Sequence, residues 1–381
     1  MDFKLTEEQL RVQQMAREFA EKDLAPGVIE RDMNSTFPLD EFNKLGATGI
    51  YGLPFDPKVG GQGGSYLSYI LAVEEVSKVE ASFGIAFSVN TSLFCGSVDL
   101  SSASDEIKKK YIAPVAAGKK IGSFALTEPD AGSDAAGQKT VAVQDGDHYI
   151  INGSKCFNTN GPFADFTVVY CLTDPALGIK GMAAFIVEKG TPGFRVGKIE
   201  DKMGIHSAQV SDMILENVRV PAENMIAKPG EGFKLAMKAL DGGRIGVAAQ
   251  ALGIAKGAFR IARDYMLERE QFGKPIAFQQ YLQFTMAQLQ TEIEAAEGLL
   301  YKAAIRKEMG EPYTVPAAMA KLYCSDVAMK VTTQAVQMLG GNGYMREYQV
   351  ERMMRDAKIT QIYEGTNEIQ KLVIAGALFR K

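Results

Sequence analysis

The hydrophobic pattern of this chain changes character twice, and that order restricts the folds it can adopt. Residues 1–118 carry apolar residues at helical spacing, such as Leu67 and Ile70. Residues 119–226 contain short apolar runs rich in Val, Ile and Phe, separated by turn residues, which is typical of strands. Residues 227–381 return to long helical patterns. The sequence therefore predicts an α + β protein of three domains: an N-terminal all-α domain, a middle antiparallel β-barrel or sandwich, and a C-terminal four-helix bundle.

The first helix has a clear predicted start. Thr6 and Gln9 have the spacing of a capping box, in which each side chain bonds the backbone N–H of the other residue. Leu10, Met15 and Phe19 follow as an apolar face. We expect this helix to bury those three side chains.

Turn signals and apolar runs locate the remaining elements. The Asp-Gly pair at 145–146 and the Asn-Gly pair at 152–153 are typical of two-residue hairpin turns. The apolar runs predict strands at 141–143, 148–151, 166–172, 182–187, 194–196 and 213–220. Long helices are expected at 231–268, 278–306, 314–340 and 344–357.

Composition argues against several classes of protein. Hydrophobic residues make up 46% of the 381 residues and charged residues 23%, as in an ordinary globular chain. The net charge of −4 provides no basic surface for nucleic acid or an anionic membrane. No apolar run approaches the roughly 18 residues of a membrane span. With only two histidines and no metal-binding spacing, we expect no metal site.

The N-terminus and the cysteines indicate a reducing compartment. The chain starts with a polar and acidic stretch, Met-Asp-Phe-Lys-Leu-Thr-Glu-Glu-Gln, unlike a secretory signal or a transit peptide. The cysteines lie far apart and lack CxxC spacing, so we expect free thiols in a cytoplasmic protein. These four residues are Cys95, Cys156, Cys171 and Cys324.

Residues 355–370 contain the strongest candidate for a catalytic group. One helix ends there and another begins, and Asn367 and Gln370 have the spacing of a second capping box. Glu364 lies in the turn before that helix, between an aromatic residue and a glycine. Partial burial would raise the pKa of its carboxyl toward neutrality, where a general base works best. The alternative is that Glu364 only favours the dipole of the following helix.

The string Tyr-Glu-Gly-Thr-Asn-Glu-Ile-Gln at 363–370, preceded by Arg-Asp-Ala-Lys-Ile, resembles the catalytic segment of the acyl-CoA dehydrogenase family. In that family the glutamate takes the α-proton of an acyl-CoA thioester, so the resemblance implies that Glu364 is the catalytic base. The resemblance covers the whole chain, because the family has the same order of helical, β and helical domains. Many relatives carry Arg where this chain has His206, whereas the butyryl-CoA dehydrogenases of anaerobic bacteria carry His. This similarity favours a short-chain member.

Two stretches of the middle domain resemble flavin-binding segments of the family. The first is Phe-Ala-Leu-Thr-Glu-Pro-Asp-Ala-Gly-Ser-Asp at 124–134, which by composition alone would be a turn between strands. The resemblance implies that Phe124, Leu126 and Thr127 line FAD, with the Thr127 hydroxyl near the pyrimidine edge of the flavin. Ser133 would lie beside the flavin and toward the acyl-CoA.

The second stretch is Gly-Ser-Lys-Cys-Phe-Asn-Thr-Asn-Gly at 153–161. By resemblance, Phe157 covers the isoalloxazine ring and the Thr159 hydroxyl points at flavin N5. Asn158 replaces the isoleucine usual in the family, and it is implied as a flavin contact; if buried, its amide needs partners or costs roughly 1–3 kcal/mol. Further departures from the family, whose consequences the sequence leaves open, are His206, Ala208 and Val210.

The C-terminal domain resembles the part of the family that completes the FAD site of a neighbouring subunit. Arg269 suits this role, since its planar guanidinium binds phosphate oxygens in pairs. Because these contacts come from another chain, the resemblance implies a homo-oligomer, usually a homotetramer. The residues of this domain with implied FAD contacts are Arg269, Gln271, Phe272, Gln279, Gln337, Gly340, Gly341, Thr366 and Glu368.

The run Leu-Asp-Gly-Gly-Arg-Ile-Gly at 240–246 is similar to the substrate segment of the short-chain members. Gly243 stands where the isovaleryl and long-chain relatives place their base, so no second carboxylate competes with Glu364. The pocket floor is expected around Ser88, Val89 and Thr91. The residues with implied substrate contacts are Ser133, Asp241, Arg244, Tyr363 and Gly365.

The resemblance thus implies FAD-dependent α,β-dehydrogenation of a short-chain, butyryl-CoA-type thioester to the trans-2-enoyl-CoA, or the reverse reduction. Electrons would be exchanged with an electron-transferring flavoprotein. The alternatives are an enzyme for branched, cyclic or aryl-propenoyl acyl groups, an acyl-CoA oxidase, and a non-catalytic flavoprotein. The chain-length preference, the physiological direction and the bifurcating or non-bifurcating nature of the partner stay open.

Overall fold

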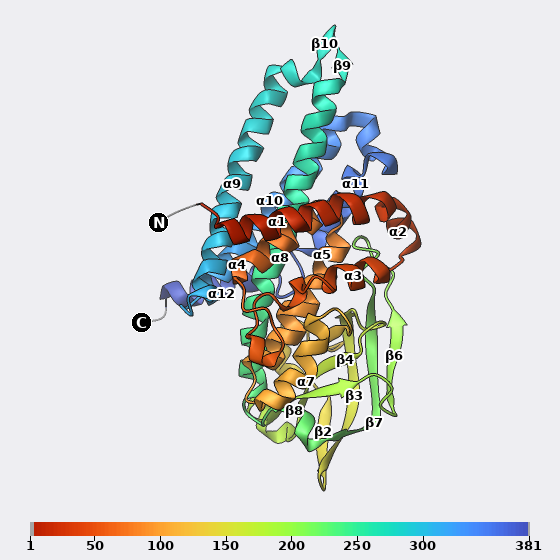
Figure 1. Cartoon of the computed structure of the whole chain (residues 1–381), viewed down its shortest axis with the longest axis vertical. Helices are drawn as coiled ribbons and strands as arrows, with labels where there is room; N and C mark the ends of the chain where they lie inside the picture. Colours follow the sequence, from red (N-terminus) through yellow and green to blue (C-terminus); the bar gives the residue numbers. More distant parts are fainter. Residues whose placement is uncertain (1–3, 380–381) are drawn as a thin grey trace.

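The structure, a computed structural model, describes residues 4–379. The first three residues of the polar N-terminal stretch and the last two of the predicted C-terminal domain lie outside it. Helices of the N-terminal part cross the middle of the molecule, a β-sheet occupies one end, and two long helices reach to the other end (Figure 1). This arrangement confirms the predicted succession of helical, β and helical parts.

The N-terminal part is helical, and its first helix begins with the predicted capping box. The Gln9 N–H donates to Thr6 Oγ1 at 3.2 Å, and the Thr6 N–H donates to Gln9 Oε1 at 2.9 Å. A π-helical stretch, Val89–Cys95, connects α5 (Ala81–Ser88) to α6 (Gly96–Leu100), so that the three segments form one continuous, largely buried helix. The α-helices are α1 (Glu7–Phe19), α2 (Val28–Asn34), α3 (Leu39–Gly46), α4 (Tyr66–Ser77), α5 (Ala81–Ser88), α6 (Gly96–Leu100) and α7 (Asp105–Ala116).

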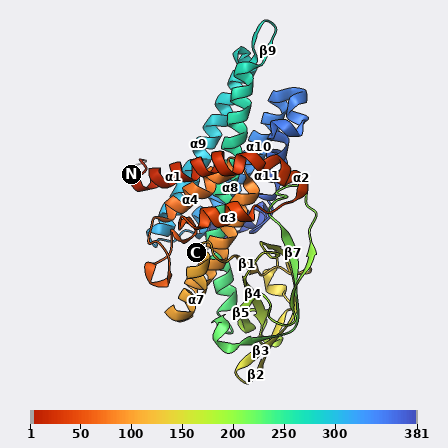
Figure 2. The ribbon, with the colours of Figure 1, turned by 45° about the vertical axis from the view of Figure 1, so that its right-hand side comes forward.

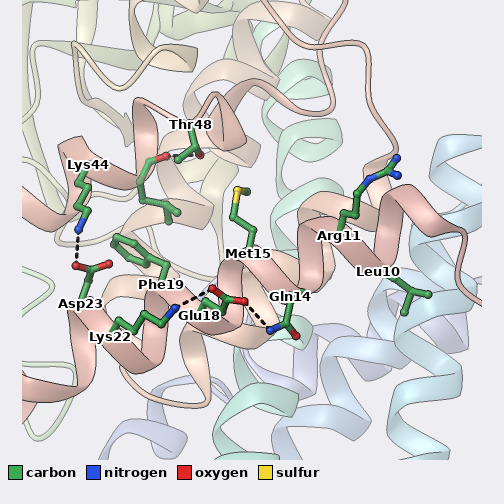
Figure 3. A pocket seen from close by; sticks show the side chains of 11 residues that line it. Leu10, Arg11, Gln14, Met15, Glu18, Phe19, Lys22, Asp23, Lys44 and Thr48 are labelled. Carbon is green, nitrogen blue, oxygen red and sulfur yellow. Dashed lines mark hydrogen bonds and ion pairs between the residues drawn. The ribbon is translucent and has the colours of Figure 1, made fainter.

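The apolar face predicted for α1 is wrong in two of its three residues. Phe19 is buried, but Leu10 and Met15 are 50% and 38% exposed. The buried side chains on α1 are Ala16 and Phe19, because this is the face that packs on the core. Leu10 and Met15 instead line a surface groove of about 630 Å³ between α1 and α3, with charged side chains at its rim (Figure 3). None of the predicted site residues lines this groove.

The middle domain is one mixed sheet, ordered β6-β7-β3-β2-β4-β5-β8, with β1 paired to β4. The antiparallel prediction is wrong for β4, which runs parallel to β1, with Gly122 opposite Phe166, and parallel to β2, with Val141 opposite Leu172. The chain enters β1 from α7 and reaches β4 only after the β2–β3 hairpin, so no tight turn forces the two strands to be antiparallel. The strands are β1 (Gly122–Ala125), β2 (Val141–Asp145), β3 (His148–Thr159), β4 (Phe166–Leu172), β5 (Met182–Glu188), β6 (Phe194–Ile199), β7 (Val210–Pro221) and β8 (Met225–Ala227).

One of the two predicted hairpin turns is a bulge. The Asp-Gly turn is confirmed, since Asp145 pairs with His148 across it. At the Asn-Gly pair, however, β3 continues, and its register against β7 shifts between Ile151 and Gly153. A Cβ at residue 153 would overlap the Thr140 side chain, so the glycine permits a close approach of two backbones rather than a reversal of the chain.

The C-terminal part contains three long helices: α8 (Gly232–Glu268), α9 (Gln280–Glu308) and α10 (Thr314–Leu339). The predicted fourth long helix is wrong in length, because α11 covers only Val350–Ile359. Gln349 before it adopts a left-handed conformation with φ 63°, which interrupts the helical path. The last helix is α12 (Asn367–Phe379). The α8–α9 pair projects beyond the other elements, with the short strands β9 (Glu270–Gln271) and β10 (Lys274–Pro275) at its tip (Figures 1 and 2).

Among residues 4–379, two helical stretches are long and apolar enough to cross a membrane by length and composition alone. These are Ala81–Leu100, whose apolar 18-residue segment is wholly buried inside the protein, and Gly232–Glu268, whose apolar 18-residue segment is 78% buried. Both stretches contribute to the largest hydrophobic core. Their apolar character is therefore explained by their place in the centre of the helical layers.

Candidate active site

Glu364 lies in a strained turn between α11 and α12. Its φ is 53° and that of Gly365 is 92°, so two successive residues are left-handed. Among residues 4–379, eight non-glycine residues have positive φ, and three of them are predicted site residues: Phe157, Phe272 and Glu364. Such conformations persist where the surroundings impose them, and they gather at functional sites.

The helix after Glu364 is capped differently from the prediction. The second capping box is wrong, because α12 begins one residue early and Thr366 Oγ1 accepts from the Ile369 N–H at 3.4 Å. The Gln370 side chain donates to the backbone oxygens of Glu364 at 3.3 Å and Gly365 at 2.8 Å. These bonds hold the turn itself rather than the helix end.

The Glu364 carboxyl is buried and has no hydrogen-bond partner for either oxygen within the described chain. Burial raises its pKa to about 8, although nearby Arg244 and Lys321 oppose the shift. A Cβ at Gly243 would overlap Glu364 Oε2, so the carboxyl lies directly against the backbone of α8. Tyr363 is fixed beside it by a hydrogen bond from its hydroxyl to Gln250 Oε1. A buried, unpaired carboxyl with a pKa near neutrality has the properties of a general base.

The predicted substrate residues of α8 lie next to this carboxyl. Arg244 donates from Nε to the backbone oxygen of Glu364 at 3.4 Å and from Nη1 to Asp241 Oδ1 at 2.6 Å. The other Asp241 oxygen accepts from Thr314 Oγ1 at 2.6 Å. The structure therefore brings Glu364, Tyr363, Asp241 and Arg244 together, as the sequence implied.

A face of α8 made of glycines meets a row of hydroxyl groups beyond Glu364. A Cβ at Gly246 would overlap Ser88 Oγ, and Tyr69 donates to that same oxygen at 3.2 Å. The Ser88 and Ser92 hydroxyls are 3.3 Å apart. Of the predicted floor residues, Ser88 faces α8, whereas Thr91 donates to the Tyr51 backbone oxygen instead.

Sequence reasoning missed Tyr69, Ser92 and Lys321, which contribute to this region. The available signal was the spacing of Gly242, Gly243 and Gly246, because several glycines on one helix face mark a close approach. The partners that approach them could not be named from the sequence.

The two stretches with implied flavin contacts lie side by side. The Cys156 N–H donates to the Thr127 backbone oxygen at 2.9 Å, which ties β3 to the end of β1. Buried Lys155 strengthens this link by donating to the Leu126 backbone oxygen at 3.1 Å and to Glu128 Oε1 at 2.7 Å. The arrangement makes one continuous wall from two segments that are about 30 residues apart in the sequence.

Several side chains on this wall are free to receive a ligand. Phe157 is 66% exposed and has a φ of 58°. The Thr127 and Thr159 hydroxyls form no hydrogen bond with any residue from 4 to 379. Asn158 is buried and donates to the Ser211 backbone oxygen at 3.0 Å, but its Oδ1 has no partner there. Exposed Ser133 lies on the loop after β1, Phe124 is half-buried, and the Leu126 side chain packs into the core.

His206 contacts oxygen acceptors through both ring nitrogens. Nε2 lies 2.6 Å from the Lys202 backbone oxygen, and Nδ1 lies 3.0 Å from the Asp32 backbone oxygen and 3.1 Å from its carboxylate. Both ring nitrogens therefore face oxygen atoms that accept hydrogen bonds. His206 thus joins the middle domain to α2. The nearby departures Ala208 and Val210 are buried apolar residues.

The predicted contacts to a neighbouring subunit are not gathered within one chain. Arg269, Gln271 and Phe272 lie exposed at the tip of the α8–α9 pair, at the end of the molecule opposite the sheet (Figure 1). Phe272 is 94% exposed. The other candidates for the cofactor are exposed or half-buried in the C-terminal part: Gln279, Gln337, Gly340, Gly341, Thr366 and Glu368.

Fold and site together define a class of three-part helical, β and helical proteins with a buried, unpaired carboxyl at a C-terminal turn. Three family models match in this order: "Acyl-CoA dehydrogenase, N-terminal domain" at residues 6–119, the "middle domain" at 123–218 and the "C-terminal domain" at 230–379. The chain belongs to the acyl-CoA dehydrogenase family. Family membership implies a flavin cofactor.

Relatives and solved structures cover this chain from end to end. It is 55% identical over 380 residues to "Acyl-CoA dehydrogenase, short-chain specific" of Clostridium acetobutylicum, with 100% of both chains covered. The butyryl-CoA dehydrogenase structure from Megasphaera elsdenii has a TM-score of 0.98 and 51% identity, again with full coverage of both chains. A chain of the structure described as "Electron transferring flavoprotein of Acidaminococcus fermentans: Towards a mechanism of flavin-based electron bifurcation" has a TM-score of 0.99, 55% identity and full coverage of both chains.

Proposed function

We propose that this chain is a short-chain acyl-CoA dehydrogenase that converts a butyryl-CoA-type thioester to the trans-2-enoyl-CoA, or catalyses the reverse reduction. The observation that carries the proposal is the buried Glu364 carboxyl, which has no partner in the described chain and a pKa of about 8. The similarity to short-chain relatives along the full length supports the acyl-chain class.

The residues on the β1–β3 wall fit FAD. An exposed aromatic ring at Phe157 suits stacking against a flat heterocycle, and the unpartnered Thr127 and Thr159 hydroxyls suit its polar edge. The orphaned Oδ1 of Asn158 offers a further acceptor. When bound, FAD supplies the acceptor for the hydride that leaves the β-carbon.

The residues of this chain provide the proton chemistry and the orientation. The ionised Glu364 carboxyl removes the proton from the α-carbon, because it is buried and has no competing donor. The Glu364 N–H donates to no group in residues 4–379, so it is available to the thioester carbonyl, where negative charge develops. Arg244 on α8 donates to the backbone oxygen of Glu364 in that turn, and Asp241 orients Arg244 through its own hydrogen bond.

Exposed apolar surface supports the proposal of a homo-oligomer, and the family resemblance implies a tetramer. Four aromatic side chains at the α8–α9 tip, Phe272, Phe278, Tyr281 and Phe284, are between 57% and 94% exposed. A second apolar surface on α12 contains Leu372, Leu378 and Phe379. Exposed patches of this kind are typically covered by another protein surface. A neighbouring tip would also bring Arg269 to the cofactor of the adjoining subunit.

We further propose an electron-transferring flavoprotein as the redox partner and a cytoplasmic location. The partner is supported by the full-length likeness to a chain of the Acidaminococcus fermentans structure. The location is supported by four buried, unpaired cysteines, since oxidising compartments favour disulfides.

The experiment is an anaerobic titration of the purified flavoprotein with saturated acyl-CoAs from propionyl- to octanoyl-CoA. We expect butyryl-CoA to bleach the flavin absorbance most efficiently, because hydroxyl groups and Gly246 close the region beyond Glu364. Absence of bleaching with every saturated acyl-CoA would contradict the proposed function. Rapid oxygen consumption with substrate would instead favour an oxidase.

A further inference from the structure

Lys321 is a buried cation without a carboxylate partner. It lies on α10 with none of its surface exposed. Among residues 4–379 it forms no ion pair, and its one hydrogen bond is from Nζ to Asn367 Oδ1 at 2.9 Å. Burial lowers the pKa of this ammonium, and the nearby Glu364 carboxyl opposes that shift. A buried charge that is left unpaired is unfavourable, so its presence requires an explanation.

The hydrogen bonds of Asn367 connect Lys321 to the turn that carries Glu364. The Asn367 N–H donates to the Gln361 backbone oxygen at 3.0 Å, closing the turn. Its Nδ2 donates to Ser325 Oγ and to Asp326 Oδ1, each at 2.9 Å. The turn is therefore clamped to α10 beside the lysine, and Lys321 and Glu364 share one buried region.

Four other charged groups could balance Glu364 or Lys321, and none does so fully. Arg244 on α8 is paired with Asp241 at 2.6 Å, so this pair has no net charge. Asp326 accepts hydrogen bonds from the side chains of Asn367 and Gln361, and Glu368 on α12 is exposed. The electrostatic surroundings of Glu364 therefore depend on Lys321.

We propose that Lys321 is a positioning residue whose ammonium keeps the Glu364 carboxylate in the charged form that accepts the substrate proton. The proposal rests on the proposed function, because it assigns Lys321 a role in the same proton transfer. Lys321 lowers the pKa of Glu364, and Glu364 raises the pKa of Lys321. Each group therefore favours the charged form of the other, which supports the proposal. The two groups titrate as a coupled pair.

The test compares the pH profile of kcat/KM for butyryl-CoA in the wild type and in Lys321→Gln. Glutamine removes the charge but still donates to Asn367 Oδ1. We expect the acid limb of the profile to move up by about one pH unit, with about a tenfold loss on the acid side, because a nearby positive charge lowers a carboxyl pKa by about that much. Lys321→Arg should keep the acid limb near its wild-type position.

Two further variants distinguish the effect of the Lys321 charge from the effect of its hydrogen bond and from that of a surface lysine. Lys321→Met lacks both the charge and the hydrogen bond, and it should shift the acid limb as far as Lys321→Gln does. Lys330→Gln is the matched control, because Lys330 lies exposed on the same helix in a surface pair with Glu292. It should leave the profile unchanged.

A second readout is independent of turnover. The pH dependence of the difference in unfolding free energy between wild type and Glu364→Gln reports the titration of Glu364 in the folded protein. With the Lys321→Gln substitution in both proteins, that titration should move up by about one pH unit.

An unmoved acid limb and an unmoved unfolding titration in Lys321→Gln would overturn the proposal while leaving the proposed function intact. Failure of both neutral variants to fold would also overturn it, because Lys321 would then be structural. If the wild type does not bleach with any acyl-CoA, the proposed function fails first, and the unfolding titration still tests the coupling.

Discussion

Glu364 combines a left-handed backbone with a buried carboxyl, and a substitution that removes the carboxyl exposes the effect of its burial on stability. In the folded protein burial raises the carboxyl pKa from its ordinary 4.5 to about 8. The folded state therefore binds more protons than the unfolded state between these values, so this group makes stability fall as pH rises from 4.5 to 8. We predict that Glu364→Gln lacks this pH-dependent contribution to the unfolding free energy.

Urea unfolding at a series of pH values tests the prediction. The variant should gain stability relative to wild type as pH rises, by a few kcal/mol at pH 9, because each pKa unit corresponds to about 1.4 kcal/mol. A constant difference from pH 5 to 9 would show that Glu364 titrates normally.

Some residues of the site could be predicted from the sequence, and others could not. Glu364, Asp241 and Arg244 were identified from short motifs, and the structure brings them into contact. Lys321 has no such signal, because a lysine in an Ala-rich helix is ordinarily exposed, and only the packing of α10 against the turn buries it. Leu10 and Met15 fail for the converse reason: apolar residues on a helix need not face the core.

At the scale of elements, the contact between α8 and the catalytic turn depends on glycine. We predict that Gly243→Ala lowers kcat/KM at least 100-fold, since its Cβ would overlap Glu364 Oε2 and lie 2.7 Å from Leu93 Cδ2. Gly298→Ala in α9 is the control, because a Cβ there meets no atom within 4 Å. The control should keep full activity and gain up to about 1 kcal/mol of stability. Equal activity of the two variants would argue against close contact at residue 243.

The link between β1 and β3 supports a second prediction at this scale. Lys155→Met leaves Glu128 without its buried partner, so we expect a loss of about 3 kcal/mol in unfolding free energy and weaker FAD binding. Lys139→Met, which removes an exposed pair with Asp130, should change stability by less than about 0.5 kcal/mol. Denaturant titrations and FAD dissociation constants measure both effects. Unchanged FAD affinity in Lys155→Met would show that this ion pair does not support FAD binding.

Strand polarity and turn chemistry set the limit of element-level prediction. Most strand positions followed from apolar runs and turn residues, but the parallel pairing of β1 depends on which strand it meets in space. The Asn-Gly pair at 152–153 has the composition of a turn and forms a bulge, because Thr140 and β7 hold both sides of β3. Such choices depend on tertiary contacts that a local pattern does not contain.

On the scale of the whole molecule, the order of helical, β and helical parts was predictable because hydrophobic periodicity differs between them. Hydrophobic periodicity does not predict which residues complete the cofactor site. Arg269 lies at a tip remote from the sheet of its own chain (Figure 2). We predict that Arg269→Ala weakens FAD retention through the neighbouring subunit. Arg195→Ala, at an exposed surface pair on β6, is the control.

Dialysis followed by visible spectroscopy, with the oligomeric state measured by light scattering, tests this prediction. Arg269→Ala should lose yellow colour while the control keeps it. Full colour in Arg269→Ala would contradict the assignment of the tip to a neighbouring cofactor site.

Glu364 as the base for the α-proton is the most direct point at which the proposed activity can be tested. Anaerobic mixing of the flavoprotein with butyryl-CoA, followed by flavin absorbance over time, isolates that step from electron transfer. We predict that Glu364→Gln binds FAD normally and bleaches at least about 10²–10⁴-fold more slowly than wild type. Bleaching by Glu364→Gln at the wild-type rate would contradict it.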